Sequence, residues 1–231
     1  MPKRFILLTS CLIVAAFCVR LGVWQLDRRA ARRAVNEQAR AGLTLLPIDI
    51  DSFAGTAVPE RFRRVRAVGV FDYTREVVIS PRVRNGSPGV HVVTALARAG
   101  TDTIVPVVRG WVYAPDAVTV ELERWREGDS ARVEGYVIAL DTTGADDAAS
   151  ARESRAVRWL DRARLAERFG APVMSYYIVM TGPEGDRAST PARLTDPVLA
   201  EGPHMSYAVQ WFLFAAIFGA GGTLVVLRGA A

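Results

Sequence analysis

The stretch that decides the fold is PHMSYAVQWFLFAAIFGAGGTLVVL, residues 203–227, which carries no formal charge and is followed by Arg228. At about 1.5 Å per helical residue, a stretch of this length can cross a hydrocarbon core of about 30 Å. It therefore predicts a membrane-spanning helix. Gly219, Gly221 and Gly222 indicate close helix packing rather than a phosphate loop, because no strand precedes them and no lysine follows.

A second apolar stretch lies near the start of the chain. Residues 5–26 read FILLTSCLIVAAFCVRLGVWQL, and their single charge, Arg20, is near one end, where a long side chain can reach the interface. A cleaved signal peptide is the alternative, but no A-x-A-like site follows the stretch. We therefore predict spans at residues 5–26 and 203–227 around a domain at residues 27–202, with both termini on one side of the membrane.

Charge is concentrated beside the first span. Seven basic residues and one acidic residue precede Val35, whereas the rest of the chain carries 22 basic and 23 acidic residues. A nucleic-acid-binding protein would carry its positive charge across the folded domain, so no nucleic-acid partner is expected and the cluster indicates a membrane flank. A literal count of the arginines at positions 28, 29, 32 and 33 would place the domain in the cytoplasm, although this rule weakens for long domains.

The composition argues against an enzyme. The 231 residues are 50% apolar, which excludes disorder, and both cysteines, Cys11 and Cys18, lie in the first span. With His91 and His204 as the two histidines of the chain, zinc sites and most histidine-based triads are hard to build. Asp72 with Glu76, or Glu121 with Glu123, could form an acid/base pair, but such carboxylates are usually solvated.

The central segment is predicted to be mainly β. We predict that residues 28–40 continue the first helix, which ends at Gly42. The clearest turn is predicted at residues 84–89. A short helix spans residues 161–169, ends at Gly170 and follows an exposed loop at residues 141–150. Apolar, β-branched segments predict strands at residues 63–71, 75–80, 90–97, 103–112, 131–140, 157–160 and 175–180. We expect an α+β, mainly antiparallel domain, a small barrel or sandwich resembling an OB fold.

His204 is the strongest candidate for a functional residue. It lies in the first turn of the second span, and Tyr207 and Trp211 follow it at helical spacing on one face. The topology places Trp24 and Gln25, at the end of the first span, at the same depth. Such a cluster could bind a flat amphipathic ligand, because imidazole ligates iron and aromatic faces pack against a macrocycle. An interfacial histidine beside an ordinary aromatic belt is the alternative.

Five ordered motifs resemble those of the surfeit locus protein 1 family, whose members assist the assembly of cytochrome c oxidase. They are LGVWQLDR at residues 21–28, FRRVRAVGVFD with REV at residues 62–77, GSPGVHVVT at residues 86–94, RGWV at residues 109–112 and HMSYAVQWF at residues 204–212. The resemblance runs from the first span to the second. Departures from the family pattern at Val90, Ala95 and Val108 fall in the central domain.

The resemblance implies a two-pass protein of the bacterial inner membrane, with cytoplasmic termini and the domain on the outer face, or the corresponding mitochondrial arrangement. It implies help in delivering haem a to oxidase subunit I or stabilising it there, with His204 as the ligand of the haem iron. The candidate haem-binding residues are His204, Tyr207, Trp211, Trp24 and Gln25. Implied partners are subunit I, other assembly factors or haem a synthase, and membrane lipid.

Two other interpretations remain open. The chain could be a structural interaction module that holds oxidase subunits without binding haem, and a membrane-anchored hydrolase is a more distant possibility, since its nucleophile set is missing. His91 is expected to be a strand residue with a hydrogen-bonding role. It is not expected to be a second axial ligand, because it belongs to the domain.

Overall fold

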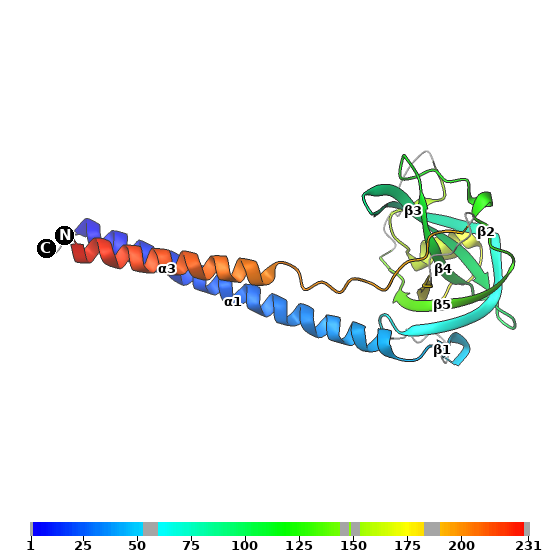
Figure 1. Ribbon diagram of the computed structural model, residues 1–231, viewed down its shortest axis with the longest axis horizontal. Coiled ribbons are helices and arrows are strands. Elements are labelled where there is room, and N and C mark those ends of the chain that lie inside the picture. Colours follow the sequence, from blue (N-terminus) through cyan, green and yellow to red (C-terminus); the bar gives the residue numbers. More distant parts are fainter. Residues whose placement is uncertain (1, 53–59, 144–147, 149–152, 183–189, 229–231) are drawn as a thin grey trace. The chain divides into compact units, whose positions relative to one another are not determined.

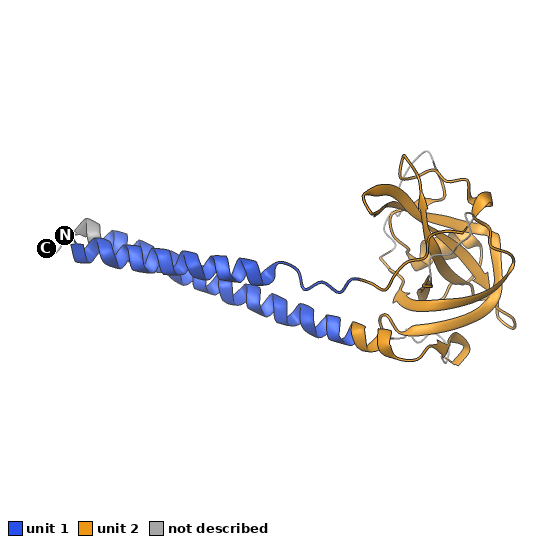
Figure 2. Cartoon of the chain, in the orientation of Figure 1, with its two compact units in different colours: residues 1–38, 198–231 blue, residues 39–197 orange. Residues whose placement is uncertain are grey.

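A computed structural model of the chain describes residues 2–52, 60–143, 148, 153–182 and 190–228, with the backbone alone at residues 2–4. Two compact units make up the chain (Figure 2). One comprises residues 1–38 and 198–231, and the other comprises residues 39–197. We call them the helical unit and the sheet unit.

The helical unit contains two long helices, α1 (Pro2–Thr44) and α3 (His204–Arg228), which lie side by side (Figure 1). Both are long and apolar enough to cross a membrane, and at most 17% of the most apolar window of either helix is buried. The core helix of a soluble protein would be buried far more extensively. The two helices thus fit a two-pass membrane protein.

Small residues line the contact between α1 and α3. A Cβ atom added at Gly222 would lie 2.8 Å from the Cβ of Cys11, and one at Gly22 would lie 2.7 Å from the ring of Phe212. These contacts join the start of α1 to the end of α3 and the middle of α1 to the first half of α3, so the helices run antiparallel. The predicted close packing is confirmed at Gly222. It is wrong for Gly219 and Gly221, where an added Cβ would meet no atom within 4 Å.

The predicted continuation of the first helix through residues 28–40 is confirmed, but the helix extends past Gly42 to Thr44. Gly42 does not end the helix; it permits a close approach. A Cβ there would lie 3.0 Å from the carbonyl oxygen of Arg61. The glycine that indicated a helix end is therefore explained by packing instead.

The sheet unit contains one mixed sheet whose four longest strands pair antiparallel, in the order β5-β2-β3-β4. Strand β7 pairs parallel to β4 and antiparallel to β5, so the path β2-β3-β4-β7-β5 returns to β2. The short strands β1 and β6 both pair parallel to β2. The bounds are β1 Ile48–Asp49, β2 Arg64–Arg84, β3 Ser87–Ala97, β4 Val105–Tyr113, β5 Ser130–Ala139, β6 Ala156–Val157 and β7 Tyr176–Met180. A barrel or sandwich of the OB type stays a prediction.

Strand β2 replaces two strands that the sequence predicts separately, at residues 63–71 and 75–80. Its pairing with β3 shifts register between Asp72 and Glu76 and again between Ile79 and Arg82. Such bulges bend a strand without ending it, and they accommodate Pro81, which lacks a backbone donor. The polar residues that indicated a break therefore mark a bend in one long strand.

The predicted turn at residues 84–89 is confirmed but is shorter, because Arg84 already pairs with Ser87. Asn85 and Gly86 form the two-residue loop with φ of 50° and 79°. Two successive positive φ values are typical of a type I′ hairpin, which asparagine followed by glycine favours.

The remaining connections follow their local signals. Helix α2 (Arg162–Phe169) begins after Asp161, whose carboxylate accepts hydrogen bonds from the backbone NH groups of Ala163 and Arg164, and it ends at Gly170 with φ 60°. The 3-10 turns η1 (Ile50–Ser52) and η2 (Leu122–Trp125) complete the described elements. Most of the loop predicted at residues 141–150 lies outside the described residues.

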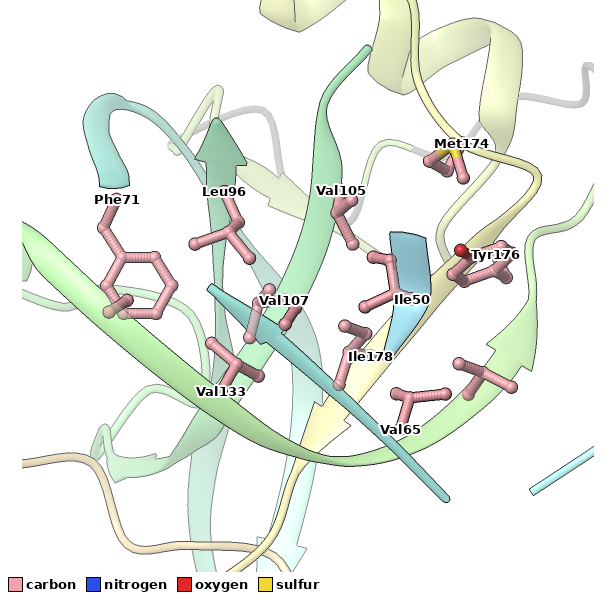
Figure 3. Close-up of a cluster of buried hydrophobic side chains, with 13 residues drawn as sticks. Ile50, Val65, Phe71, Leu96, Val105, Val107, Val133, Met174, Tyr176 and Ile178 are labelled. Atoms are coloured by element: carbon pink, nitrogen blue, oxygen red, sulfur yellow. The ribbon is translucent and has the colours of Figure 1, made fainter. Parts of the chain in front are cut away.

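The hydrophobic core of the sheet unit is built from alternate residues of its strands (Figure 3). Val65 and Phe71 of β2, Val107 of β4 and Ile178 of β7 point toward one another, and η1 adds Ile50. All five are at least 94% buried. The period of two that predicted these strands is thus the period of the core.

Candidate functional site

The helical unit brings together two of the predicted site residues, Gln25 of α1 and His204 of α3. The Nδ1 atom of His204 lies 2.8 Å from the Oε1 atom of Gln25, and both side chains are half-buried. The prediction that the end of the first span and the start of the second lie at the same level is correct for this pair.

The contact selects one tautomer of the neutral imidazole. Since the amide oxygen can only accept, Nδ1 must carry the proton and donate it to Oε1. In the neutral ring, the lone pair available for a metal then lies on Nε2. A hydrogen bond of this kind, from the distal nitrogen of a ligating histidine to an oxygen, is the usual way in which proteins orient the ring.

Gly202 leaves room at the Nε2 edge of the ring. Its φ is +76°, and a Cβ added there would lie 3.4 Å from both Nε2 and Cδ2 of His204. A side chain at this position would therefore be strained and would contact the Nε2 edge. Glycine keeps that edge accessible.

The other predicted site residues have rings that are exposed or packed against a different residue. Trp24 and Tyr207 are 51% and 49% exposed, and Trp211 packs edge-on against Phe214 with ring centroids 5.9 Å apart. Within the described part of the chain, no hydrogen bond or ring contact joins these three residues to His204. Tyr207 is exposed and is not among the α3 positions that face α1. Only part of the predicted aromatic face therefore packs against α1.

Polar residues of α1 hold the segment that precedes α3, and sequence reasoning missed them. Glu201 accepts hydrogen bonds from Arg29 at 3.0 Å and from Arg33 at 2.7 Å. The side-chain amide of buried Asn36 donates to the carbonyl oxygens of Leu199 and Ala200, both at 3.2 Å. Steps of three and four residues from Gln25 reach Arg29, Arg33 and Asn36 in turn, so helical spacing could have identified them.

The charge of Glu201 is fixed by these contacts. The hydrogen bond from Arg33, assisted by Arg29, lowers the pKa of the Glu201 carboxyl below its ordinary value. Glu201 therefore stays ionised at neutral pH and holds two of the four clustered arginines.

A groove of about 430 Å³ opens beside His204. Its lining combines positive charge with apolar surface and includes Arg28, Arg32 and Val35 of α1 together with Glu201, Gly202 and His204. The groove belongs wholly to the helical unit.

The donor set suits a ligand that carries its own metal. In the ranges that the structure describes, no three His, Cys, Asp or Glu side chains come together as a metal-binding group. A single imidazole cannot enclose a bare ion, but it could supply one nitrogen to an iron that a macrocycle already holds. His204, with Nε2 accessible and a cationic groove beside it, fits that role.

A second polar centre lies in the sheet unit around Arg109 of β4, whose side chain is completely buried. Its guanidinium donates to the carboxylate of Glu76 at 2.9 Å, to the carboxylate of Glu127 at 3.0 Å and to the hydroxyl of Thr94 at 2.7 Å. It also lies over the ring of Tyr73, 5.2 Å from the centroid. Glu76 belongs to β2, Thr94 to β3 and Arg109 to β4, so the centre joins three neighbouring strands.

The carboxylate pairs that the sequence offered as acid/base candidates are occupied elsewhere. Glu76 pairs with Arg109, whereas Asp72 accepts from the backbone NH of Thr74 and pairs with Arg75. Glu121 is exposed and pairs with Arg124.

His91 is a strand residue of β3, as predicted, opposite Ile79 and Trp111. Burial, with the nearby charges of Arg82 and Arg84, lowers the pKa of its imidazole to about 4. Its predicted hydrogen-bonding role is wrong for the residues that are described, since none of them forms a hydrogen bond with the imidazole. His91 is a neutral packed ring.

Comparison with known proteins agrees with the ordered motifs. A "SURF1-like protein" from Monosiga brevicollis is 24% identical over 208 residues, which cover 85% of this chain and 78% of that protein. A "SURF1-like protein" from Caenorhabditis briggsae is 28% identical over 118 residues, 42% of this chain and 37% of that protein. The "Cytochrome oxidase assembly protein SHY1" of Saccharomyces cerevisiae is 30% identical over 103 residues, 42% of this chain and 26% of that protein. Since the model of the SURF1 family matches residues 12–216, from within α1 to within α3, the chain belongs to the SURF1 family.

Proposed function

We propose that this protein is a membrane-anchored, non-enzymatic assembly factor for haem-copper cytochrome c oxidase that holds haem a at His204 for subunit I. Family membership and the name of the yeast relative support the assembly role. The observation that carries the haem role is the 2.8 Å contact from His204 Nδ1 to Gln25 Oε1, which leaves Nε2 free.

Haem would supply an iron that can accept a further ligand. His204 would supply an imidazole nitrogen to that iron, and Gln25 would keep the ring in the tautomer that can ligate. Gly202 keeps Nε2 accessible, and exposed aromatic rings such as Trp24 and Tyr207 offer apolar surface at the same end of the helix pair. A single protein ligand permits release to a partner, because one bond has to be exchanged rather than several.

The proposed location is the bacterial inner membrane, with cytoplasmic termini and the sheet unit on the outer face. Subunit I, other assembly factors or haem a synthase are the proposed partners. A phosphatase reporter inserted at the exposed turn at Gly100 is expected to be active, since that enzyme folds outside the cytoplasm. A cytosolic fluorescent reporter at the same site should then stay dark, and the opposite pattern would reverse the topology.

The haem role is tested by the visible spectrum of the protein purified from membranes of cells that make haem a. We expect a Soret band that His204→Ala removes almost completely. His91→Gln is the matched control because it changes the other histidine of the chain, and it should retain the band. An unchanged spectrum in His204→Ala would contradict the site.

The alternative is a structural interaction module that holds oxidase subunits without haem. Exposed apolar side chains on both helices, such as Phe17 and Ile217, favour it, because a partner helix could cover them as well as lipid. Co-purification of oxidase subunits without haem, from cells replete in haem a, would support the module and contradict haem binding.

A further inference from the structure

The four arginines that follow the first span divide into two pairs with different surroundings. Arg29 and Arg33 share the carboxylate of Glu201. Arg28 and Arg32 instead line the groove beside His204. Two of the four arginines are therefore paired with Glu201 and two line the groove, so the cluster is more than a basic membrane flank.

The guanidinium groups of Arg28 and Arg32 have unused donors. No hydrogen bond or ion pair of Arg28 is found within the described ranges, and Arg32 makes one long contact of 3.5 Å from Nε to the carbonyl oxygen of Ala200. Glu201, the acidic residue of the groove, is already shared between two other cations. The groove therefore presents two positive groups without anionic partners.

Spacing and chemistry define what these two groups can bind. Residues four apart on a helix lie on the same face with Cβ atoms about 6 Å apart, so Arg28 and Arg32 project together. An arginine fork matches a carboxylate with two parallel hydrogen bonds. Two neighbouring forks therefore suit a ligand with two carboxylates at one edge, and haem carries its two propionates in that way.

We infer that Arg28 and Arg32 bind the two propionate carboxylates of the haem whose iron is ligated by His204. The inference rests on the proposed haem function, and it adds a specificity device that the histidine alone cannot supply. A free carboxylate would be held and an esterified one would not, because an ester carries no negative charge to pair with arginine.

The test uses the full chain in nanodiscs of zwitterionic lipid, titrated with ferric haem b and with its dimethyl ester while the Soret band is followed. We expect the unmodified protein to bind the free acid at least tenfold more tightly than the ester. Arg28→Gln and Arg32→Gln should each weaken binding of the acid about tenfold, which corresponds to about 1.4 kcal/mol. The double variant should bind acid and ester equally.

Arg40→Gln is the control, because Arg40 is an exposed arginine of α1 that does not line the groove. It should bind the acid as the unmodified protein does. Equal affinity for acid and ester in the unmodified protein, with binding still lost in His204→Ala, would overturn the inference and leave the haem function standing. Absence of haem binding, or binding that survives His204→Ala, would overturn both.

Lipid phosphate is the other source of an oxyanion at this level. The titration is therefore repeated in nanodiscs that contain anionic lipid. If Arg28→Gln/Arg32→Gln changes association with anionic vesicles but leaves the preference for acid over ester intact, the groove binds lipid and the inference is wrong.

Discussion

The Arg109 centre of the sheet unit and the His204 rim of the helical unit, which consists of Gln25, Arg28, Arg32 and His204, are both built from charged and polar groups. They differ in how many of these groups have protein partners. The guanidinium of Arg109 is completely buried and bonded to Glu76, Glu127 and Thr94. The His204 ring is half-buried and uses one nitrogen, and Arg28 beside it has no described partner. A centre with every partner supplied by the protein stabilises a fold, whereas one with accessible donors and acceptors can bind a ligand.

The largest effect is expected when Arg109 is replaced. Arg109→Met would leave the buried carboxylate of Glu76 without its cation, whereas Glu127 would keep its ion pair with Arg193. Unpairing a buried charge destabilises by about 3–5 kcal/mol. Urea unfolding of the full chain in micelles, followed by tryptophan fluorescence, measures the loss. Arg75→Met is the control, because its ion pair with Asp72 is partly exposed to solvent and contributes at most about 1 kcal/mol. A loss below about 1 kcal/mol in Arg109→Met would remove the contrast between the two centres.

We expect protonation of His91, in the sheet unit, to make the free energy of unfolding depend on pH. The folded-state pKa of about 4 lies below the ordinary value of 6.5. Between these pH values the unfolded chain binds a proton that the folded chain does not, so the free energy of unfolding falls as the pH is lowered from 6.5 to 4. The total loss is about 3 kcal/mol at most.

His91→Gln should abolish this part of the pH dependence, and His204→Gln should leave it in place. The measurement is the urea midpoint from pH 7 to pH 4. If His204→Gln abolished the pH dependence instead, His204 and not His91 would determine stability at acidic pH.

Much of the fold follows from local sequence signals. The apolar stretches, the Asn85-Gly86 turn and the Asp161 cap each depend on neighbouring residues, so they are readable in one pass. The merging of two predicted strands into β2 is not readable in this way. Whether polar residues end a strand or form a bulge depends on the partner strand, and pairing across β3 decides it.

Only part of the candidate site could be predicted, again because some of its contacts depend on residues that are distant in the sequence. Helical topology brings Gln25 to the level of His204, and that pair was predicted. Roles for Arg29, Arg33 and Asn36 depend on how residues 198–202, which have no regular structure, follow α1. A segment without periodicity gives no signal of which groups it will contact.

The rim can be tested through Gln25. Gln25→Leu removes the acceptor that holds Nδ1–H, and loss of such an orienting contact typically weakens metal ligation by about 10- to 100-fold. Gln25→Glu keeps an acceptor oxygen and should retain binding. The measurement is a haem titration followed in the Soret region. If Gln25→Leu bound haem as tightly as the unmodified protein, the tautomer of His204 would not depend on this contact.

The smallest expected effect concerns how the two helices of the rim are held together. Gly222→Ala places a methyl group 2.8 Å from the Cβ of Cys11, and overpacking of this kind costs about 1–3 kcal/mol. Replacing glycine by alanine within a helix also contributes about 1 kcal/mol of stability through helix propensity. Gly221→Ala isolates that gain, because an added Cβ there meets no atom within 4 Å. We therefore expect Gly222→Ala to unfold at a lower detergent concentration than Gly221→Ala. It should also bind haem less tightly than Gly221→Ala, because Gln25 and His204 lie on different helices. Equal behaviour of the two variants would show that the pairing of α1 and α3 does not depend on close approach at Gly222.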